Sequence, residues 1–402
     1  MIKNIIHSGS SLYRNYIRFL SILLFLIISP VSFLFSQDSK KATESGPVDI
    51  NIFPERYFTS KPVFQVPPGI NPDDSLVKLG YLNVELYGAI PDDNEDDTEE
   101  IQQAIFDSYM YSYAVYFPSG TYNVSNTLNC MCPVFINGTE QTMSSIRPAH
   151  VLIGASIGPR PVIKLDDNCP GFQDASVVQY ATTGKDPEMV SRYTTLKPVI
   201  NFWRQSPDGG GSVDRELNRG NINFNQTFRG IDIDLGSGNP GAVGLWMQGA
   251  EGTTCQDVKI TAYGAFAGMY DMMGSGGSPT NLEIYGGEYG IYAYKLRPIP
   301  CVTGLKLHDQ EQACFYVGDF TPITFVGFEF KKDDGPVFKF KTPYHPCQGN
   351  LSLIDGKIEL TNGSANSQLI ENGLTDNKER ILYLKNVYTK GAGEIIHHTV
   401  SN

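Results

Sequence analysis

The sequence of 402 residues predicts an all-β fold, a parallel β-helix. An apolar, polar, apolar triplet recurs at steps of 27, 24, 23, 23 and 23 residues. Its members are Ile231-Asp232-Ile233, Val258-Lys259-Ile260, Leu282-Glu283-Ile284, Leu305-Lys306-Leu307, Phe328-Glu329-Phe330 and Leu351-Ser352-Leu353. Short alternating strands that recur at such a period are typical of stacked coils in a parallel β-helix. The middle residues alternate in sign through the fifth triplet, and we expect them to neutralise one another on an exposed sheet face.

A second series of triplets lies between members of the first, at steps of 24, 22 and 24 residues. Its members are Gly244-Leu245-Trp246, Gly268-Met269-Tyr270, Gly290-Ile291-Tyr292 and Cys314-Phe315-Tyr316. Two interleaved series with a common period indicate one structural unit repeated along an axis. Propeller blades need about 40 residues per repeat or more, so this period excludes a propeller.

The composition favours a loop-rich globular protein that does not bind nucleic acid. The chain contains 40 Gly and 25 Pro, and its formal net charge is −12. Nucleic-acid phosphates require a basic stripe, and the sequence contains none. The same charge makes a polyanionic ligand difficult to hold without a bridging cation. Because a solenoid lengthens without thickening its core, one long domain is compatible with this length.

The N-terminus predicts export from the cytoplasm. Basic residues up to Arg18 precede an apolar run from Phe19 to Ile28, a pattern typical of a secretory signal peptide over residues 1–36. The alternative is an uncleaved anchor helix. Residues 37–75 are rich in polar residues and proline and predict a linker with an extended arm. Residues 76–402 then form the β-helix domain, which we expect to be secreted or extracytoplasmic, with no membrane association after signal cleavage.

The start of the predicted domain alternates between strands and one helix. Leu82 to Ala89 predicts a strand, and Val115 to Val124 predicts a strand, a turn and a second strand. Between them, helical spacing of apolar residues predicts a helix near Thr98 to Tyr109, with Asp97 or Thr98 as its N-cap.

These segments resemble a known family. "VELYGAIPDDNEDDTEEIQQAI" and "VYFPSGTYNVS" resemble the opening of the pectate-lyase superfamily, in its rhamnogalacturonase and epimerase-like group. The resemblance implies a single-stranded right-handed parallel β-helix with an N-terminal capping helix. Pro91-Asp92-Asp93 replaces the family's usual Gly-Asp-Gly. The motif is specific for the fold and does not specify a reaction.

A second resemblance covers residues 161–330. "PVIKLDDNCPGF", "PVINFW", "RGIDIDLGSGNPGAVGLWMQGAEGTTCQDVKI" and "GSGGSPTNLEIYGGEYGIYAYK" resemble the first β-helix of family 55 glycoside hydrolases, which are exo-acting β-1,3-glucanases. Those enzymes pair two β-helices, and the second supplies the catalytic acid, whereas this chain holds one. Lys295-Leu296-Arg297 also replaces a glutamine-rich segment of that family. No polar cap follows the strands predicted at 381–384 and 395–400, so we expect a second lobe or a partner to cover the C-terminal end.

The second series of triplets predicts an outward aromatic column of Trp246, Tyr270, Tyr292 and Tyr316, because the preceding apolar residues take the inward parity. Flat amphipathic rings suit pyranose rings, so the column predicts a groove that binds a polysaccharide or oligosaccharide. The alternative is that loops cover the column, or that the rings only stabilise the sheet.

Polar residues near the column supply candidate chemistry. Glu251 and Asp271 are the best carboxylate pair for glycoside hydrolysis. The substrate-binding residues that we predict are Trp246, Gln248, Tyr270, Tyr292, Lys295, Arg297 and Tyr316. Histidines form no recognisable cluster, so no metal site is predicted.

Three functions remain open from these residues. The leading one is hydrolysis of a β-glucan-like polymer, which requires no cofactor. The second is a polysaccharide lyase that acts on a uronate polymer, with a cation such as calcium and with Asp271, Lys295 and Arg297 in the site. The third is a non-catalytic solenoid that binds glycans.

Overall fold

The computed structural model describes residues 65–132, 135–136, 139–140, 149–175, 179–182, 190–193, 196–207, 213–218, 223–293, 300–318, 322–340, 350–372 and 381–398. The predicted signal peptide, most of the linker, and Lys295 and Arg297 lie outside the described residues. Phe64–Asn402 forms one compact unit. Among the described helices, none has the length and apolar character needed to span a membrane.

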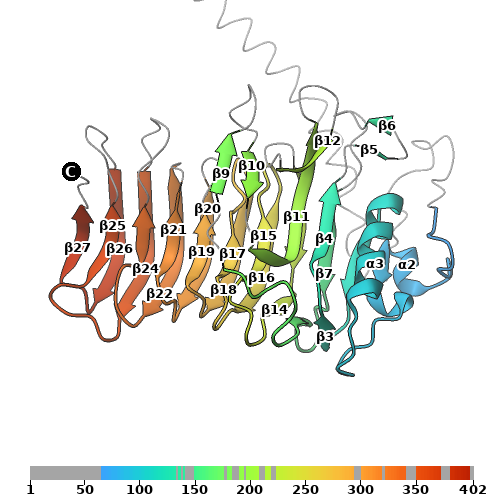
Figure 1. The fold of residues 1–402 in the computed structure, drawn as a ribbon, viewed down its shortest axis with the longest axis horizontal. Helices are drawn as coiled ribbons and strands as arrows, with labels where there is room; N and C mark the ends of the chain where they lie inside the picture. The colour runs from blue at the N-terminus through green and yellow to red at the C-terminus, as the bar shows by residue number, and fades with distance from the viewer. Residues whose placement is uncertain are drawn as a thin grey trace, which may run out of the picture. The chain divides into compact units, whose positions relative to one another are not determined.

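A capping helix covers the first coil (Figure 1). Helix α3 (Thr98–Tyr111) buries Ile101, Ala104 and Ile105 in the same core as the first strands, as predicted. A short helix, α2 (Ser75–Lys78), precedes it. Asp97 is the N-cap residue, although its side chain makes no capping hydrogen bond.

The strand predicted at 82–89 is wrong in part. Strand β1 (Tyr81–Asn83) ends after three residues, and a 3-10 helix, η2 (Val84–Tyr87), follows. The side chain of Asn83 accepts a hydrogen bond from the backbone N–H of Glu85 at 3.1 Å. Asparagine side chains compete with strand pairing in this way, because they bond to backbone groups two residues ahead.

Two long parallel sheets form the walls of the solenoid, and their strands follow one another from α3 to β27 in Figure 1. The first sheet contains β1, β2 (Ala114–Phe117), β3 (Thr121–Val124), β7 (Val151–Gly154), β8 (Val162–Leu165), β13 (Thr227–Arg229), β14 (Asp232–Asp234), β16 (Thr254–Thr261), β18 (Ser278–Tyr285), β20 (Cys301–His308), β22 (Ile323–Lys332), β24 (Asn350–Leu360) and β26 (Ile381–Lys390). The parallel pairing confirms the predicted all-β parallel β-helix.

The second sheet faces the first across the core. Its parallel strands are β4 (Leu128–Cys132), β11 (Lys197–Pro207), β15 (Ala242–Met247), β17 (Ala267–Tyr270), β19 (Tyr289–Ala293), β21 (Ala313–Val317), β23 (Phe338–Phe340), β25 (Gln368–Asn372) and β27 (Glu394–His398). Antiparallel strands β9 (Gln179–Thr182), β10 (Val190–Tyr193) and β12 (Val213–Asn218) extend it through β11. A small separate pair is β5 (Phe135–Ile136) with β6 (Thr139–Glu140).

In the coils from β13 to β26, a left-handed residue interrupts the extended backbone of the first sheet. These residues have φ between 52° and 67°, and they are Gly230, Asp257, Asn281, Gly304, Gly327, Asp355 and Asn386. Only Gly, Asn and Asp adopt this conformation readily, so the residue types follow from the backbone conformation. Neighbouring left-handed residues also bond to each other: Nδ2 of Asn281 donates to Oδ1 of Asp257 at 2.8 Å.

The register confirms five of the six triplets in the first series. Ile233, Ile260 and Ile284 lie directly opposite one another on adjacent strands. The sixth assignment is wrong, because Leu351 pairs with Ile323, while the partner of Phe328 is Gly356. The extra residues between β22 and β24 moved the true triplet beyond the expected step.

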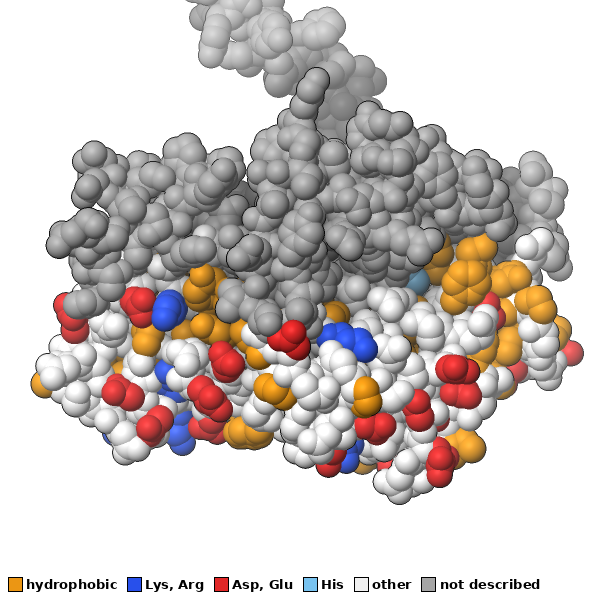
Figure 2. Space-filling view, in the orientation of Figure 1, with side chains coloured by type: hydrophobic (Ala, Val, Ile, Leu, Met, Phe, Trp, Pro, Cys, Tyr) orange, Lys and Arg blue, Asp and Glu red, His pale blue; other side chains and the backbone are white. Residues whose placement is uncertain are grey.

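Charges on the outer face of the first sheet alternate as predicted, and the corrected register continues the alternation. Lys306 Nζ lies 2.9 Å from Glu283 Oε1, and Lys357 occupies the position next to Glu329 on the following strand. In Figure 2, basic side chains lie among acidic ones on the visible described surface. Opposite charges on adjacent strands therefore neutralise one another, as predicted.

The last described coil has an exposed outer edge. Ile381, Tyr383, Leu384 and Tyr388 on β26 are exposed. An apolar cavity of about 260 Å³ opens beside Leu384 and Ile395, between the ends of the two sheets. The second lobe or partner predicted for this end stays a prediction.

Candidate functional site

The aromatic column predicted from the sequence exists on the outer face of the second sheet. Trp246, Tyr270, Tyr292 and Tyr316 pair in register on β15, β17, β19 and β21. Their preceding residues, Leu245, Met269, Ile291 and Phe315, belong to the main core, whereas the four aromatic residues form a separate cluster. The outward parity is therefore confirmed.

The glycine that begins the first three triplets has a packing role. A Cβ atom on Gly268 would lie 2.3 Å from Ile284 Cγ2, and one on Gly244 would lie 2.8 Å from Ile260 Cγ2. These positions face the core, as does the residue that follows each of them, so two consecutive residues point inward. The residue before the glycine then faces outward again, as Val243 and Ala267 do in the aromatic cluster.

The outer face therefore carries two parallel lines of side chains. The first line contains Trp246, Tyr270, Tyr292, Tyr316, Lys339 and Glu371. The second contains Val243, Ala267, Tyr289, Ala313, Gln368 and Glu394. Both lines change from apolar or aromatic residues to polar ones after β21.

The aromatic half of the face is closed. Tyr292 and Tyr316 stack with ring centroids 4.3 Å apart, and Trp246 lies 4.2 Å from Tyr270. Phe266 packs edge-on against Tyr292 at 5.0 Å. Between 0 and 9% of each ring in the column is exposed, so the rings contact one another rather than solvent. Their predicted role in sugar binding stays a prediction.

The predicted carboxylates lie on adjacent loops that differ in exposure. Glu251 is exposed in the loop after β15, whereas Asp271, at the end of β17, is 1% exposed. The loops touch, because Gly274 N–H donates to the Gly249 carbonyl at 3.0 Å. Gln248 is also buried, and its carbonyl accepts a hydrogen bond from Asn223 Nδ2 at 3.1 Å. Glu251 and Asp271 thus lie on neighbouring coils as expected, with only Glu251 at the surface.

The polar half of the face contains residues that sequence reasoning missed. Lys339 Nζ lies 3.7 Å from Glu371 Oε2, and the two side chains are 34% and 25% exposed. The series of triplets that end in an aromatic residue stops at Tyr316, and longer insertions after β23 and β25 disturb the period. The alternation of apolar and charged residues in Phe338-Lys339-Phe340 was the available signal.

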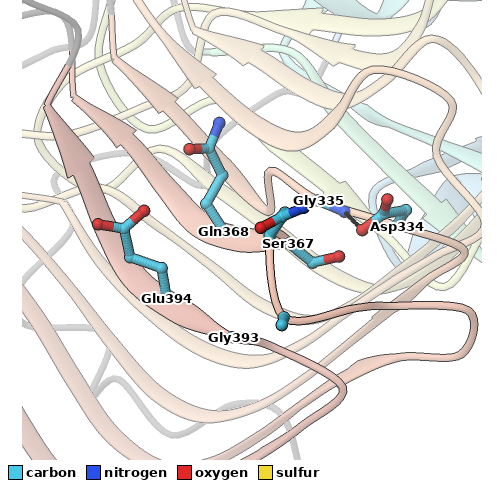
Figure 3. Close-up of a pocket in the computed structure, with 8 residues that line it drawn as sticks. Asp334, Gly335, Ser367, Gln368, Gly393 and Glu394 are labelled. Atoms are coloured by element: carbon cyan, nitrogen blue, oxygen red, sulfur yellow. Dashed lines mark hydrogen bonds between the residues drawn. The ribbon is translucent and has the colours of Figure 1, made fainter.

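A pocket of about 590 Å³ lies beside this polar half, at the turns that lead into β23, β25 and β27 (Figure 3). Its lining residues are Asp334, Gly335, Ala365, Asn366, Ser367, Gln368, Gly393 and Glu394. Figure 3 shows Asp334 and Glu394 at opposite ends, with Gln368 between them. The pocket is therefore polar, with a carboxylate at each end.

Hydrogen bonds keep Asp334 ionised. A hydrogen bond from the Ser367 side chain, together with the Gly335 N–H at 2.7 Å, holds the pKa of Asp334 below its ordinary value.

The junction between the two halves is also acidic. Burial, with Glu288, Tyr316 and Glu371 nearby, raises the pKa of Tyr289 to about 12.

The fold and this face can be compared with known proteins. The family model described as rhamnogalacturonase A/epimerase, pectate lyase-like, matches residues 81–334. The chain belongs to this family. The first resemblance drawn from the sequence is thereby confirmed, and the fold is a right-handed β-helix. The resemblance to family 55 glycoside hydrolases stays a prediction.

Solved structures similar to this pectate lyase-like chain come from diverse sources. The phiAB6 tailspike, in complex with oligosaccharides of Acinetobacter baumannii surface polysaccharide, is 13% identical with a TM-score of 0.43 over 77% of this chain. The chain covers 47% of that tailspike, about half of its length.

Two further solved structures have lower TM-scores. The A-module of the Azotobacter vinelandii mannuronan C-5 epimerase AlgE6 is 15% identical, with a TM-score of 0.34 over 79% of this chain and 97% of that one. The catalytic unit of the GH87 alpha-1,3-glucanase from Streptomyces thermodiastaticus strain HF3-3 is 12% identical, with a TM-score of 0.26 over 80% of this chain and 68% of that one. A search of curated protein sequences found no match.

The described part of this pectate lyase-like chain contains no group of three or more His, Cys, Asp or Glu side chains placed to hold a metal ion.

Proposed function

We propose that this protein acts on an extracellular polysaccharide and hydrolyses the glycosidic bonds of a β-glucan-like polymer. The observation that carries the proposal is the polar pocket on the outer face of the second sheet, beside the closed aromatic column, with a carboxylate at each end. Carbohydrate sites combine aromatic surfaces with hydrogen-bonding side chains and carboxylates.

The proposed catalytic pair is Glu251 and Asp271. Glycoside hydrolysis requires one carboxylic acid to protonate the leaving oxygen and a second carboxylate to act as nucleophile or to activate water. The exposed Glu251 suits contact with a polymer, and Asp271 begins the neighbouring loop. Glu288 is the alternative acid, because burial and the nearby Glu311 raise its pKa.

The proposed reaction requires no cofactor, and calcium would enter only with a lyase mechanism. The N-terminal basic and apolar segment supports a location outside the cytoplasm. Lys295 and Arg297, which lie outside the described residues, remain proposed substrate contacts. A second lobe at the C-terminal end would supply further contacts.

A non-catalytic glycan-binding protein is the second candidate. The burial of Asp271 favours it, because a catalytic carboxylate must reach the glycosidic oxygen. The polar pocket could bind sugar without the buried residues.

One experiment separates these functions. The secreted protein is incubated with neutral and uronate polysaccharides, and reducing ends and ultraviolet absorbance are measured in parallel, with and without chelator. Hydrolysis gives reducing ends alone, whereas elimination by a lyase gives both signals and requires the cation. Binding without either signal identifies the non-catalytic function, and the absence of both binding and cleavage contradicts the proposal.

A further inference from the structure

We propose that the 590 Å³ pocket between Asp334 and Glu394 is a subsite for an uncharged pyranose ring and that it excludes uronates. This inference rests on the proposed function, because it names the sugar class that the same face takes. It adds residues on the last three described coils to a site that sequence reasoning had placed on earlier coils.

The pocket is continuous with the outer face. Gln368 and Glu394 line it, and they lie in the same outward line as Tyr289. Successive parallel strands lie about 4.8 Å apart, so a glycan along the solenoid axis would pass from Tyr316 to the pocket within about two to three strands. The volume falls within the range of about 300–1,000 Å³ that is typical of small-molecule sites.

The lining chemistry suits hydroxyl groups. The carboxylates of Asp334 and Glu394 accept hydrogen bonds from hydroxyls, and the Gln368 amide both donates and accepts. Hydrogen bonds to charged groups are stronger than those between neutral groups, so a ring that reaches both carboxylates gains affinity without carrying charge.

The charge of the pocket opposes an acidic sugar. None of the described residues that line it is Lys, Arg or His. Two lysines lie nearby: Lys339 Nζ lies 3.7 Å from Glu371, and Lys332, whose charge helps to lower the pKa of Asp334, donates to the carbonyls of Gln312 and Pro336. A uronate in the pocket would therefore meet two carboxylates and no basic side chain among the lining residues, and like charges repel one another.

The test is binding of two ligand series to the full mature protein, measured by calorimetry. Neutral β-1,3-gluco-oligosaccharides are compared with oligogalacturonides of the same length. We expect neutral ligands to bind and their dissociation constant to rise about ten-fold with Glu394→Gln or Gln368→Ala. Glu329→Gln, on the outer face of the first sheet, is the matched control and should leave binding unchanged.

A gain-of-function variant strengthens the test. Glu394→Lys places a cation at the edge of the pocket, and we expect it to bind oligogalacturonides at least about five-fold more tightly than the parent protein does. The thermal unfolding temperature of each variant is measured as a control for folding. Because Glu394 is exposed, we expect its variants to unfold at the same temperature as the parent protein.

The outcomes separate the two proposals. Neutral binding that neither Glu394→Gln nor Gln368→Ala weakens overturns the subsite and leaves the proposed function intact. Tighter binding of the parent protein to uronate oligomers than to neutral ones also overturns the subsite. Tighter, salt-sensitive binding to glucosamine oligomers than to neutral ones overturns it as well. If no glycan of any class binds or is cleaved, the subsite and the proposed function both fail.

Discussion

The rings of Tyr292 and Tyr316 lie face to face on adjacent strands, with centroids 4.3 Å apart and planes inclined by 2°. Parallel in-register pairing produces this contact, because equivalent positions on successive coils lie directly above one another. The contact makes the column a second packed cluster outside the solenoid core. Truncations in the column therefore affect stability before they affect any ligand.

We expect Tyr292→Ala to lower the free energy of unfolding by about 3 kcal/mol, as is typical of large-to-small aromatic substitutions at buried positions. Urea denaturation followed by fluorescence measures it. Tyr292→Phe keeps the ring stack and should lose less stability than Tyr292→Ala does. If Tyr292→Ala unfolds at the parent urea concentration, the ring does not pack as described.

Catalytic variants test the proposed pair directly. Glu251→Gln and Asp271→Asn are expected to lower the rate of glycan hydrolysis by at least about 100-fold, because each removes a group that transfers a proton or attacks the sugar. Reducing-end assays at saturating substrate measure the loss. Full activity in both variants would move the assignment to Glu288, and Glu288→Gln would then be the inactive protein.

Lys332 is a buried lysine whose loss should destabilise the fold. Its Nζ donates to the carbonyl oxygen of Gln312 at 3.1 Å and to that of Pro336 at 3.4 Å. Lys332→Met leaves these carbonyls without that donor, at an expected loss of about 1–3 kcal/mol in unfolding free energy. Chemical denaturation measures the change, with Lys331→Met as the control at a partly exposed neighbour. Equal effects at both positions would argue against the buried bonds.

Asp97 predicts a dependence of stability on pH. Burial, partly opposed by the Ile90 N–H, raises the pKa of this carboxyl from 3.8 to about 6. The folded state thus binds the proton more tightly than the unfolded state does. The stabilisation of the folded state by this proton is fully present below about pH 4 and is lost as the pH rises through about 6.

Asp97→Asn should remove this component. Urea midpoints between pH 4 and 7 for the parent protein and the variant give a difference curve, and we expect the variant to gain relative stability as the pH rises. A flat difference curve would show that Asp97 does not titrate in this range.

The left-handed positions in the first sheet predict how Gly304 tolerates substitution. Gly304 has a φ of 65°, so Gly304→Ala should lower the unfolding free energy by about 1–2 kcal/mol. Gly304→Asn should be milder, because Asn281 and Asn386 occupy the same position on other coils. Thermal unfolding of the two variants tests this order, and a reversed order would contradict it.

Much of the fold was readable from local pattern. Ile233, Ile260 and Ile284 stack as their spacing predicted, because a solenoid places each repeat directly on the previous one. The outward parity of Trp246 and Tyr270 was also predictable from the alternation of strand side chains. The error at Leu351 arose where an insertion broke the period, which a step count alone does not detect.

The sequence by itself determined the stacked coils, the capping helix and the two faces of the sheet, because these depend on residues close together along the chain. Only the tertiary structure decided which side chains reach solvent. Trp246 packs against Tyr270, and Asp271 is buried. Lys339 and Gln368 lie on the open part of the same face, and the strand pairing that places them there spans insertions in the sequence. Exposure depends on what packs above a residue, and contacts between distant segments, rather than local spacing, establish it.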